Sequence, residues 1–259
     1  MIGLTRRLLL IALSAATSIA LAYSLFGVGF MVCTLPQATS FIGGTFSGWE
    51  HATYPEEDMA EIAEAVRSFS IDGTSSENLY NTIDSVMEEA EPQIAALFEA
   101  GSVLDSTFDT TMLESTNLAE LEEEYSLPRN ALSHLQDCTP IFTTGRISVG
   151  VVGVFALAGL IALGILAGRK RVGGALIAAS ALVLGLLVVL GIWAWIDFNG
   201  LFTWMHTLLF VQGNWTFDVD SLLITLFPEA FWAAMAGLWI ISSVVLALIV
   251  GLIGKLFAR

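Results

Sequence analysis

Val172–Ile196 reads VGGALIAASALVLGLLVVLGIWAWI, which is 25 consecutive residues without a charged side chain. About 20 such residues are enough for one helix to cross the hydrocarbon core of a bilayer. A helix is needed because hydrocarbon offers no hydrogen-bond partners, and a helix satisfies its own backbone groups. This stretch therefore predicts a transmembrane helix.

Three further runs of similar length also lack charged residues: Leu8–Val32, Ile147–Gly168 and Phe231–Gly254. The composition agrees, because 55% of the 259 residues are hydrophobic and only 14% are charged. The mean hydropathy is +0.75, and soluble domains of this length seldom carry so few charges. We expect an all-α, polytopic membrane protein with four transmembrane helices.

The charged residues separate by sign along the chain. All 25 acidic residues lie in residues 34–144 and 197–230, and only three of the ten basic residues lie there or at their edge: Arg67, Arg129 and Arg146. The other seven flank the apolar runs on the opposite side, which the positive-inside rule makes cytoplasmic: Arg6, Arg7, Arg169, Lys170, Arg171, Lys255 and Arg259. Both termini are therefore expected in the cytoplasm.

This topology divides the chain into five segments. Residues 1–33 form a cytoplasmic stub and the first helix, and residues 34–145 form an acidic extracytoplasmic domain. Residues 146–196 hold the second and third helices with a short basic loop. Residues 197–230 form an extracytoplasmic interfacial loop, and residues 231–259 form the fourth helix and the C-terminus.

The N-terminal run also has features of a secretory signal. Two arginines precede an apolar stretch, and Ala20–Ala22 fits an A-x-A cleavage site. Cleavage there leaves three helices. Because the apolar run continues beyond this site to Val32, it is long enough to remain as an anchor, and we favour four helices.

The acidic domain is predicted to be helical. Pro55 followed by three acidic residues is a typical helix start, and Gly73 is a typical helix end. The apolar residues between them recur at spacings of three and four, which places them on one face: Met59, Ile62, Val66 and Phe69.

Further along, a second helix is predicted for Ser76–Ala90, with its apolar face inward. Pro92 interrupts this pattern. Gly101–Asn117 is rich in Ser, Thr and Asp and predicts a loop, after which Pro128 begins a short helix.

Two patterns of small residues suggest contacts. Gly164 and Gly168 form a G-x-x-x-G motif, which is typical of close helix packing in membranes. Cys33 and Cys138 are both expected outside, where a disulfide between them can form. Two unpaired cysteines are an equally good explanation.

His206 lies in the apolar, aromatic stretch Phe202–Phe231. The leucine, methionine and phenylalanine residues around it predict a helix that lies in the membrane interface. Six tryptophans near the outer ends of the last two runs fit an interfacial aromatic belt. Taken alone, His206 fits a surface position on an amphipathic helix better than a catalytic one.

His134 changes this interpretation. It precedes Asp137 by three residues, so both share one helical face, where the carboxylate can fix the imidazole tautomer and raise its basicity. His134 and His206 are both expected close to the outer leaflet. His51 lies far from any apolar run and is predicted to be a surface residue.

Two stretches resemble a bacterial family of four-helix membrane proteins that includes the lipoprotein intramolecular transacylase. SHLQDC (Ser133–Cys138) is similar to the outer histidine motif of that family, in which the last pair is more often Asp-Val. MHTLLFVQGNWTFDVDSLLITLFPEAFW (Met205–Trp232) is similar to its second signature: a histidine, a phenylalanine, Asn-Trp, an aspartate, and Leu-Phe-Pro before the last helix.

The resemblance implies acyl transfer within a lipoprotein. The sn-2 acyl chain of the diacylglyceryl group on the N-terminal cysteine moves to the α-amine of that cysteine, which gives the lyso-form. The catalytic histidines of the family carry over onto His134 and His206. The implied partners are a diacylated bacterial lipoprotein and membrane lipid, with no metal, nucleotide or other cofactor, and the acidic outer surface does not favour nucleic acid.

The chemistry suits these residues. An α-ammonium with a pKa of about 8 must lose a proton before it attacks an ester, and a histidine with a pKa of about 6.5 can accept it. A second imidazole can return a proton to the glycerol oxygen. Asn214, the indole of Trp215 and backbone amides are candidates for oxyanion stabilisation, and Asp137 supports His134. Asp218 and Asp220 either bind the substrate ammonium or are simply solvated.

Two other functions fit the sequence. His134, Asp137 and His206 include residue types that bind divalent metals, so a metal-binding membrane protein is one alternative. A non-enzymatic envelope protein whose acidic outer domain binds a partner is the other.

Overall fold

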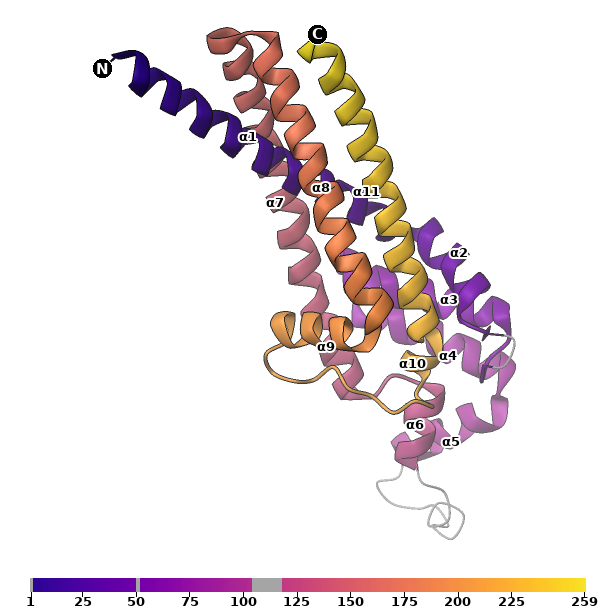
Figure 1. Cartoon of the computed structure of the whole chain (residues 1–259). Helices are drawn as coiled ribbons and strands as arrows, with labels where there is room; N and C mark the ends of the chain where they lie inside the picture. Colours follow the sequence, from indigo (N-terminus) through magenta and orange to yellow (C-terminus); the bar gives the residue numbers. More distant parts are fainter. Residues whose placement is uncertain (1, 50–51, 104–117) are drawn as a thin grey trace. The chain divides into compact units, whose positions relative to one another are not determined.

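The computed structural model describes residues 2–49, 52–103 and 118–259. Every regular element within these ranges is helical (Figure 1). The helices are α1 (Ile2–Cys33), α2 (Pro36–Phe46), α3 (Glu56–Arg67), α4 (Ser76–Ala90), α5 (Pro92–Val103), α6 (Leu118–Tyr125), α7 (Arg129–Ala167), α8 (Arg169–Ile196), α9 (Phe198–Leu209), α10 (Leu222–Leu226) and α11 (Glu229–Ala258), with a π-helical turn, η2 (Ser68–Asp72), after α3.

The chain divides into two compact units. The membrane unit comprises Met1–Cys33, Thr143–Trp204 and Ala236–Arg259. The histidine unit comprises Thr34–Phe142 and Met205–Met235, and it includes all three histidine positions of the chain.

Four helices are long and apolar enough to cross a membrane, and they are α1, α7, α8 and α11. The shortest of them, α8, has 28 residues. At about 1.5 Å per residue it exceeds the hydrocarbon thickness of about 30 Å. The predictions of an all-α fold and of four membrane-spanning helices are confirmed.

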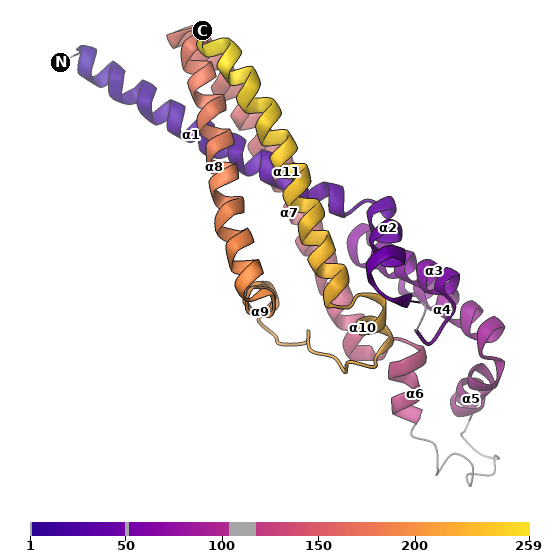
Figure 2. The same cartoon turned by 45° about the vertical axis from the view of Figure 1, so that its right-hand side comes forward.

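Small residues let the helices of the membrane unit approach closely. A Cβ placed on Gly173 of α8 would lie 2.6 Å from two backbone atoms of α11, the carbonyl oxygen of Gly254 and the amide nitrogen of Ala258. Figures 1 and 2 show α8 and α11 side by side at this end. Lipid gives helices no hydrophobic reason to associate, so close approach and hydrogen bonds hold them together. One such bond runs from Trp239 Nε1 to the carbonyl oxygen of Phe26, at 3.0 Å.

The predicted packing role of the Gly164–Gly168 motif is wrong. A Cβ on Gly164 would make only an ordinary contact, 3.7 Å from Val172 Cγ2. Gly168 stands between α7 and α8 with a φ of 80°, and a Cβ there would meet nothing within 4 Å. Its role is the left-handed turn that joins the two helices, a conformation that glycine adopts without steric cost.

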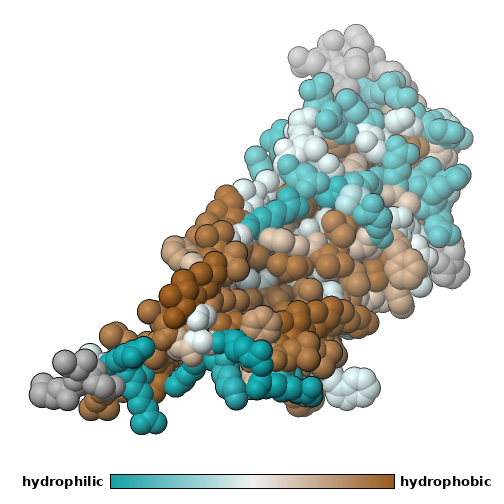
Figure 3. Space-filling view, turned by 90° about the horizontal axis from the view of Figure 1, so that it is seen from above, coloured by the Kyte–Doolittle hydropathy of each residue, from teal (hydrophilic) through white to brown (hydrophobic). Residues whose placement is uncertain are grey.

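Large apolar side chains cover the outside of the membrane unit. Examples are Trp195, Ile165 and Phe155, which are 91%, 79% and 68% exposed. The face seen in Figure 3 carries a broad area of hydrophobic side chains, and the hydrophilic ones gather in separate areas. Soluble proteins rarely expose so much contiguous apolar surface, whereas lipid accepts it.

In the histidine unit, the two predicted helices form with the predicted cores. Helix α4 has the bounds Ser76–Ala90, and Ser75 caps it by accepting from the amide of Asn78 at 3.2 Å. The chain from α3 through η2 ends at Gly73, as expected. The apolar faces of α3 and α4 are buried: Met59, Ile62, Val66, Phe69, Leu79, Ile83 and Met87.

The sequence did not predict every element correctly. Helix α2 was not foreseen, and Gly101–Val103 belong to α5 rather than to the predicted loop, the rest of which lies outside the described residues. The helix after Pro128 is not short, because α7 continues for 39 residues with Pro140 inside it. The same helix therefore carries a polar start and an apolar span.

Two tyrosine hydroxyls fix the turn before α7. Tyr54 donates to the carbonyl oxygen of Tyr125, and Tyr80 donates to that of Leu127, both at 2.7 Å. Burial raises the pKa of Tyr54 and of Tyr80, so both hydroxyls stay protonated and keep donating. The first turns of α7 are thus tied to the α3–α4 part of the same unit.

Candidate active site

His134 lies in the second turn of α7. Its side chain is only 9% exposed, and the neighbouring Leu135 and Ala131 are buried in the core of the histidine unit. Because the tyrosine hydrogen bonds hold the start of α7, the His134 side chain is placed by the packed part of the unit rather than by a loose loop.

His206 lies in the last turn of α9 and is 8% exposed. A helix, α9, forms in the sequence range where an interfacial helix was predicted. The expectation of a surface histidine is wrong, because Leu208 and Leu209 are exposed and His206 is the buried residue of this turn. An aromatic neighbour, Trp215, covers the imidazole with its ring centroid at 5.3 Å.

The two imidazoles lie close together within the histidine unit. Their ring centroids are 6.1 Å apart and their planes differ by 28°. Phe210 packs against both rings, at 4.5 Å from His134 and 5.5 Å from His206. Phe217 lies 5.6 Å from His134. The result is a pair of buried imidazoles with aromatic side chains around it.

Asp137 has a different role from the one expected. Its Oδ2 accepts hydrogen bonds from Gln212 Nε2 at 2.7 Å and from Asn214 Nδ2 at 2.9 Å. Nδ1 of His134 has no hydrogen-bond partner among the described residues, so Asp137 does not fix its tautomer through that atom. The carboxylate instead ties the loop after α9 to α7.

This loop brings the aromatic residues to the histidines. Gly213, with a φ of 76°, turns the chain between Gln212 and Asn214, in a conformation that favours glycine. Asn214 also lies 3.5 Å from Ser133 Oγ, the residue before His134. Its carboxamide oxygen is buried and has no hydrogen-bond partner in the described structure.

The two histidine segments fall within one sequence match. The family model for the lipoprotein intramolecular transacylase Lit matches residues 77–232, more than half of the chain. The chain belongs to the lipoprotein intramolecular transacylase family. The match includes both histidines, Asp137 and the loop that carries Asn214 and Trp215.

Solved structures of the transacylase family share the fold. The membrane-integral lipoprotein intramolecular transacylase Lit of Bacillus cereus is similar, with a TM-score of 0.67, 16% identity, and coverage of 98% of this chain and 96% of that one. A histidine-to-arginine variant of that protein is similar with a TM-score of 0.61, 15% identity, and coverage of 98% and 92%. None of the curated proteins matches the chain.

The loop contributes residues that the sequence interpretation did not single out. Phe210 is the phenylalanine of the signature that resembles the transacylase family, but no role was predicted for it. Gln212 and Phe217 stand in the same stretch, and nothing in their type marks them as parts of a site. Asp218 and Asp220 have exposed side chains, and the carbonyl oxygen of Asp218 accepts from the hydroxyl of Ser221 at 2.7 Å. That bond ends the loop at the start of α10.

The metal-binding alternative gains no geometric support in this transacylase family member. Within residues 2–49, 52–103 and 118–259, no group of three His, Cys, Asp or Glu side chains is placed to hold an ion. No disulfide joins Cys33 to Cys138, and the Cys138 thiol donates to the carbonyl oxygen of His134 at 3.3 Å. His51 lies outside the described residues.

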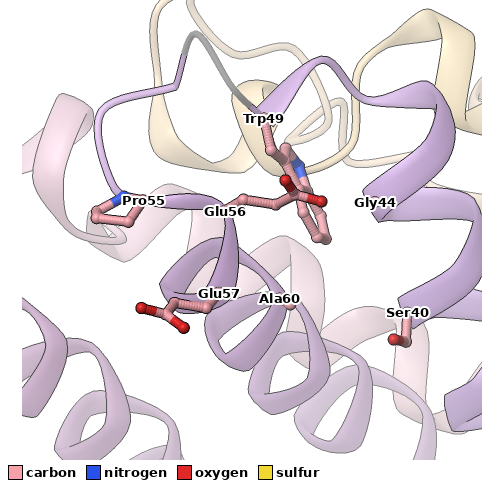
Figure 4. A pocket seen from close by; sticks show the side chains of 7 residues that line it. All are labelled: Ser40, Gly44, Trp49, Pro55, Glu56, Glu57 and Ala60. Atoms are coloured by element: carbon pink, nitrogen blue, oxygen red, sulfur yellow. The ribbon is translucent and has the colours of Figure 1, made fainter.

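A separate cavity of about 500 Å³ lies beside α2 and α3 (Figure 4). Two carboxylates border it, Glu56 and Glu57, and both stand in the first turn of α3. Acids at that position are explained by the helix dipole. The described lining residues are Ser40, Gly44, Trp49, Pro55, Glu56, Glu57 and Ala60.

Proposed function

We propose that the chain moves the sn-2 acyl chain of a diacylglyceryl-cysteine lipoprotein to the α-amine of that cysteine, giving the lyso-form. The observation that supports this most is the pair of buried imidazoles, 6.1 Å apart, within a family of lipoprotein intramolecular transacylases. The substrate is a diacylated bacterial lipoprotein in the membrane.

The reaction balances with two proton transfers. The neutral amine nitrogen attacks the carbonyl carbon of the sn-2 ester and forms a C–N bond. One imidazole takes the proton that the nitrogen sheds, and the bond from carbonyl carbon to glycerol oxygen breaks. The second imidazole gives a proton to that oxygen, which becomes a free hydroxyl.

Two separate imidazoles suit these two proton transfers. Centroids 6.1 Å apart lie beyond face-to-face contact, so each ring can serve a different atom of the substrate. The amine and the ester belong to one molecule, and well-oriented intramolecular reactions reach effective molarities on the order of 10⁵ M or more. His134 and His206 therefore need to move protons rather than to bring two reactants together.

We also propose the orientation that the basic residues indicate. Both termini are cytoplasmic, and residues 34–145 and 197–230 lie on the outer side of the membrane. In this orientation both histidines are expected close to the outer leaflet, on the side where the lipidated cysteine is presented.

Replacement of each histidine tests the function. His134→Ala and His206→Ala should each lower lyso-lipoprotein formation by about a hundredfold or more, the scale of general acid–base catalysis. The assay is mass spectrometry of lipoprotein N-termini after incubation of the purified, folded variant with a diacylglyceryl lipopeptide. His51→Ala is the matched control and should keep full activity.

A near-normal rate in His206→Ala would overturn the catalytic role of that residue. If neither histidine matters while substitutions of the acidic surface do, the non-enzymatic function becomes the better explanation. An unchanged melting temperature in each variant is required, so that unfolding does not mimic the loss.

A further inference from the structure

The orientation of the Asn214 carboxamide is fixed by its partner. Asp137 Oδ2 stands 2.9 Å from the Asn214 amide group and also accepts from Gln212. An ionised carboxylate can only accept hydrogen bonds, so the nitrogen of the carboxamide must face it. With the oxygen turned there instead, two acceptors would oppose each other at that distance.

This orientation excludes one expected role. The amide nitrogen of Asn214 is held by Asp137, with Ser133 Oγ at 3.5 Å, and is not available to donate to an oxyanion. The group that remains is the carboxamide oxygen, which is an acceptor. This oxygen can bind a hydrogen-bond donor but not an anion.

Two buried polar atoms in this region have no partner among the described residues. The carboxamide oxygen of Asn214 and Nδ1 of His134 are both shielded from solvent and lack hydrogen bonds among the described residues. A buried polar atom without a partner costs about 1–3 kcal/mol, so such atoms are rare and usually mark a ligand or a water. The His134 side chain as a whole is 91% buried, its exposed fraction being 9%.

The position of Asn214 links it to the catalytic pair. It is attached to α7 on both sides of His134, through Ser133 and Asp137. The next residue along the loop, Trp215, packs on His206, and Phe217 packs on His134. Asn214 therefore belongs to the loop segment whose neighbouring residues pack on the two imidazoles.

We propose that Asn214 binds the α-amine of the lipoprotein N-terminal cysteine, its carboxamide oxygen accepting an N–H hydrogen bond, with Asp137 and Gln212 as positioning residues. The proposal rests on the acyl transfer proposed above. Asn214 is then the group on the enzyme that recognises the nucleophile.

This role assigns the two proton transfers. Asn214 changes no covalent bond and takes no proton. Because it is attached to α7 beside His134, the amine lies on the His134 side, so His134 accepts the amine proton. His206 then gives the proton to the glycerol oxygen.

Binding measurements on wild-type and variant proteins test the role of Asn214 without acyl transfer. The probes are two ether-linked dialkylglyceryl-cysteine lipopeptides, one with the α-amine and one in which hydrogen replaces it. Neither has an ester, so no acyl transfer occurs. Wild-type protein should bind the amine form about tenfold more tightly than the desamino form, the usual scale of one hydrogen bond to a charged or polar group.

The variants locate that preference. Asn214→Leu has a similar shape and no acceptor, and it should bind the two probes within about twofold of each other. Asp137→Asn keeps an acceptor oxygen for Asn214 and should retain most of the preference, whereas Asp137→Leu should lose it. This rescue separates positioning by hydrogen bonds from an effect of charge.

Two outcomes overturn the proposal. One is wild-type protein that binds both probes equally, a result that does not depend on any variant folding; a water then occupies the Asn214 acceptor. The other is Asn214→Leu that keeps the tenfold preference. Either outcome would also remove the assignment of the two proton transfers to particular histidines, but not the need for both histidines in acyl transfer, which the conversion of the ester substrate tests independently.

Discussion

A pair of adjacent glycines on α8 gives a matched test of the packing in the membrane unit. At Gly173 an added Cβ would lie 2.6 Å from backbone atoms of α11, whereas at Gly174 it would meet nothing within 4 Å. Gly173→Ala and Gly174→Ala therefore make the same chemical change in the same helix. They differ only in what the new methyl group meets.

The size of the difference follows from this contact. Ala is favoured over Gly in a helix by about 1 kcal/mol, and both variants share that gain. Forcing a methyl group into a tightly packed place costs about 1–3 kcal/mol, and here the neighbour is backbone that cannot rotate away. The free energy of unfolding of Gly173→Ala should thus be about 1–3 kcal/mol below that of Gly174→Ala.

Thermal unfolding of the purified protein in detergent, followed by tryptophan fluorescence, measures the effect. For a chain of 150–250 residues each kcal/mol moves the melting temperature by about 2–4 °C, so Gly173→Ala should melt about 2–12 °C below Gly174→Ala. Equal melting temperatures, or a higher one for Gly173→Ala, would refute the close approach of α8 and α11.

Two further predictions concern the histidine unit and the topology. Tyr54→Phe and Tyr80→Phe each remove a donor to the turn before α7, and each should lower the free energy of unfolding by about 1 kcal/mol in denaturant titration; a double variant no less stable than wild type would show that the tethers carry no energy. A single cysteine placed beside Arg171, in protein whose own cysteines are replaced by serine, should resist an impermeant thiol reagent in whole cells. Labelling of that cysteine from outside would reverse the proposed orientation.

The membrane-spanning helices could be predicted because their cause is local. Hydrocarbon requires a continuous apolar helix, so Val172–Ile196 indicates its structure without reference to any other part of the chain. The same holds for α4, where apolar spacing, a serine cap and a following proline agree with each other. Such elements are visible in sequence because several short-range signals favour one answer.

The length of α7 could not be predicted in this way. Pro140 lacks an amide hydrogen, and polar residues precede it, so the sequence favours a break between the histidine motif and the apolar run. The helix continues nevertheless. The close contact at Gly173 was not predicted for a related reason. Its partner, α11, is distant in sequence, and no local pattern indicates that the two segments meet.

In the candidate site, too, some features could be predicted from the sequence and others could not. His134 and His206 could be nominated because the residue type and the resemblance both mark them, and the structure adds that both are buried and pack against the same aromatic ring, that of Phe210. The partner of Asp137 could not be read from the sequence. Its spacing favours His134, but the carboxylate bonds to Gln212 and Asn214, because the loop folds back over α7.

The contacts of Cys138 bear on the path of the acyl group in the proposed reaction. Cys138 is the nearest thiol in sequence to His134, and its Sγ donates to a backbone carbonyl oxygen rather than to an imidazole. A thiol becomes an effective nucleophile when a neighbouring base or cation favours the thiolate, and a carbonyl oxygen does neither. In the proposed reaction, the amine of the substrate already stands close to the ester on the same glycerylcysteine. An acyl-enzyme intermediate would add a step without improving that proximity. Direct transfer, with the protein moving two protons and holding the amine, is therefore the path that these residues favour.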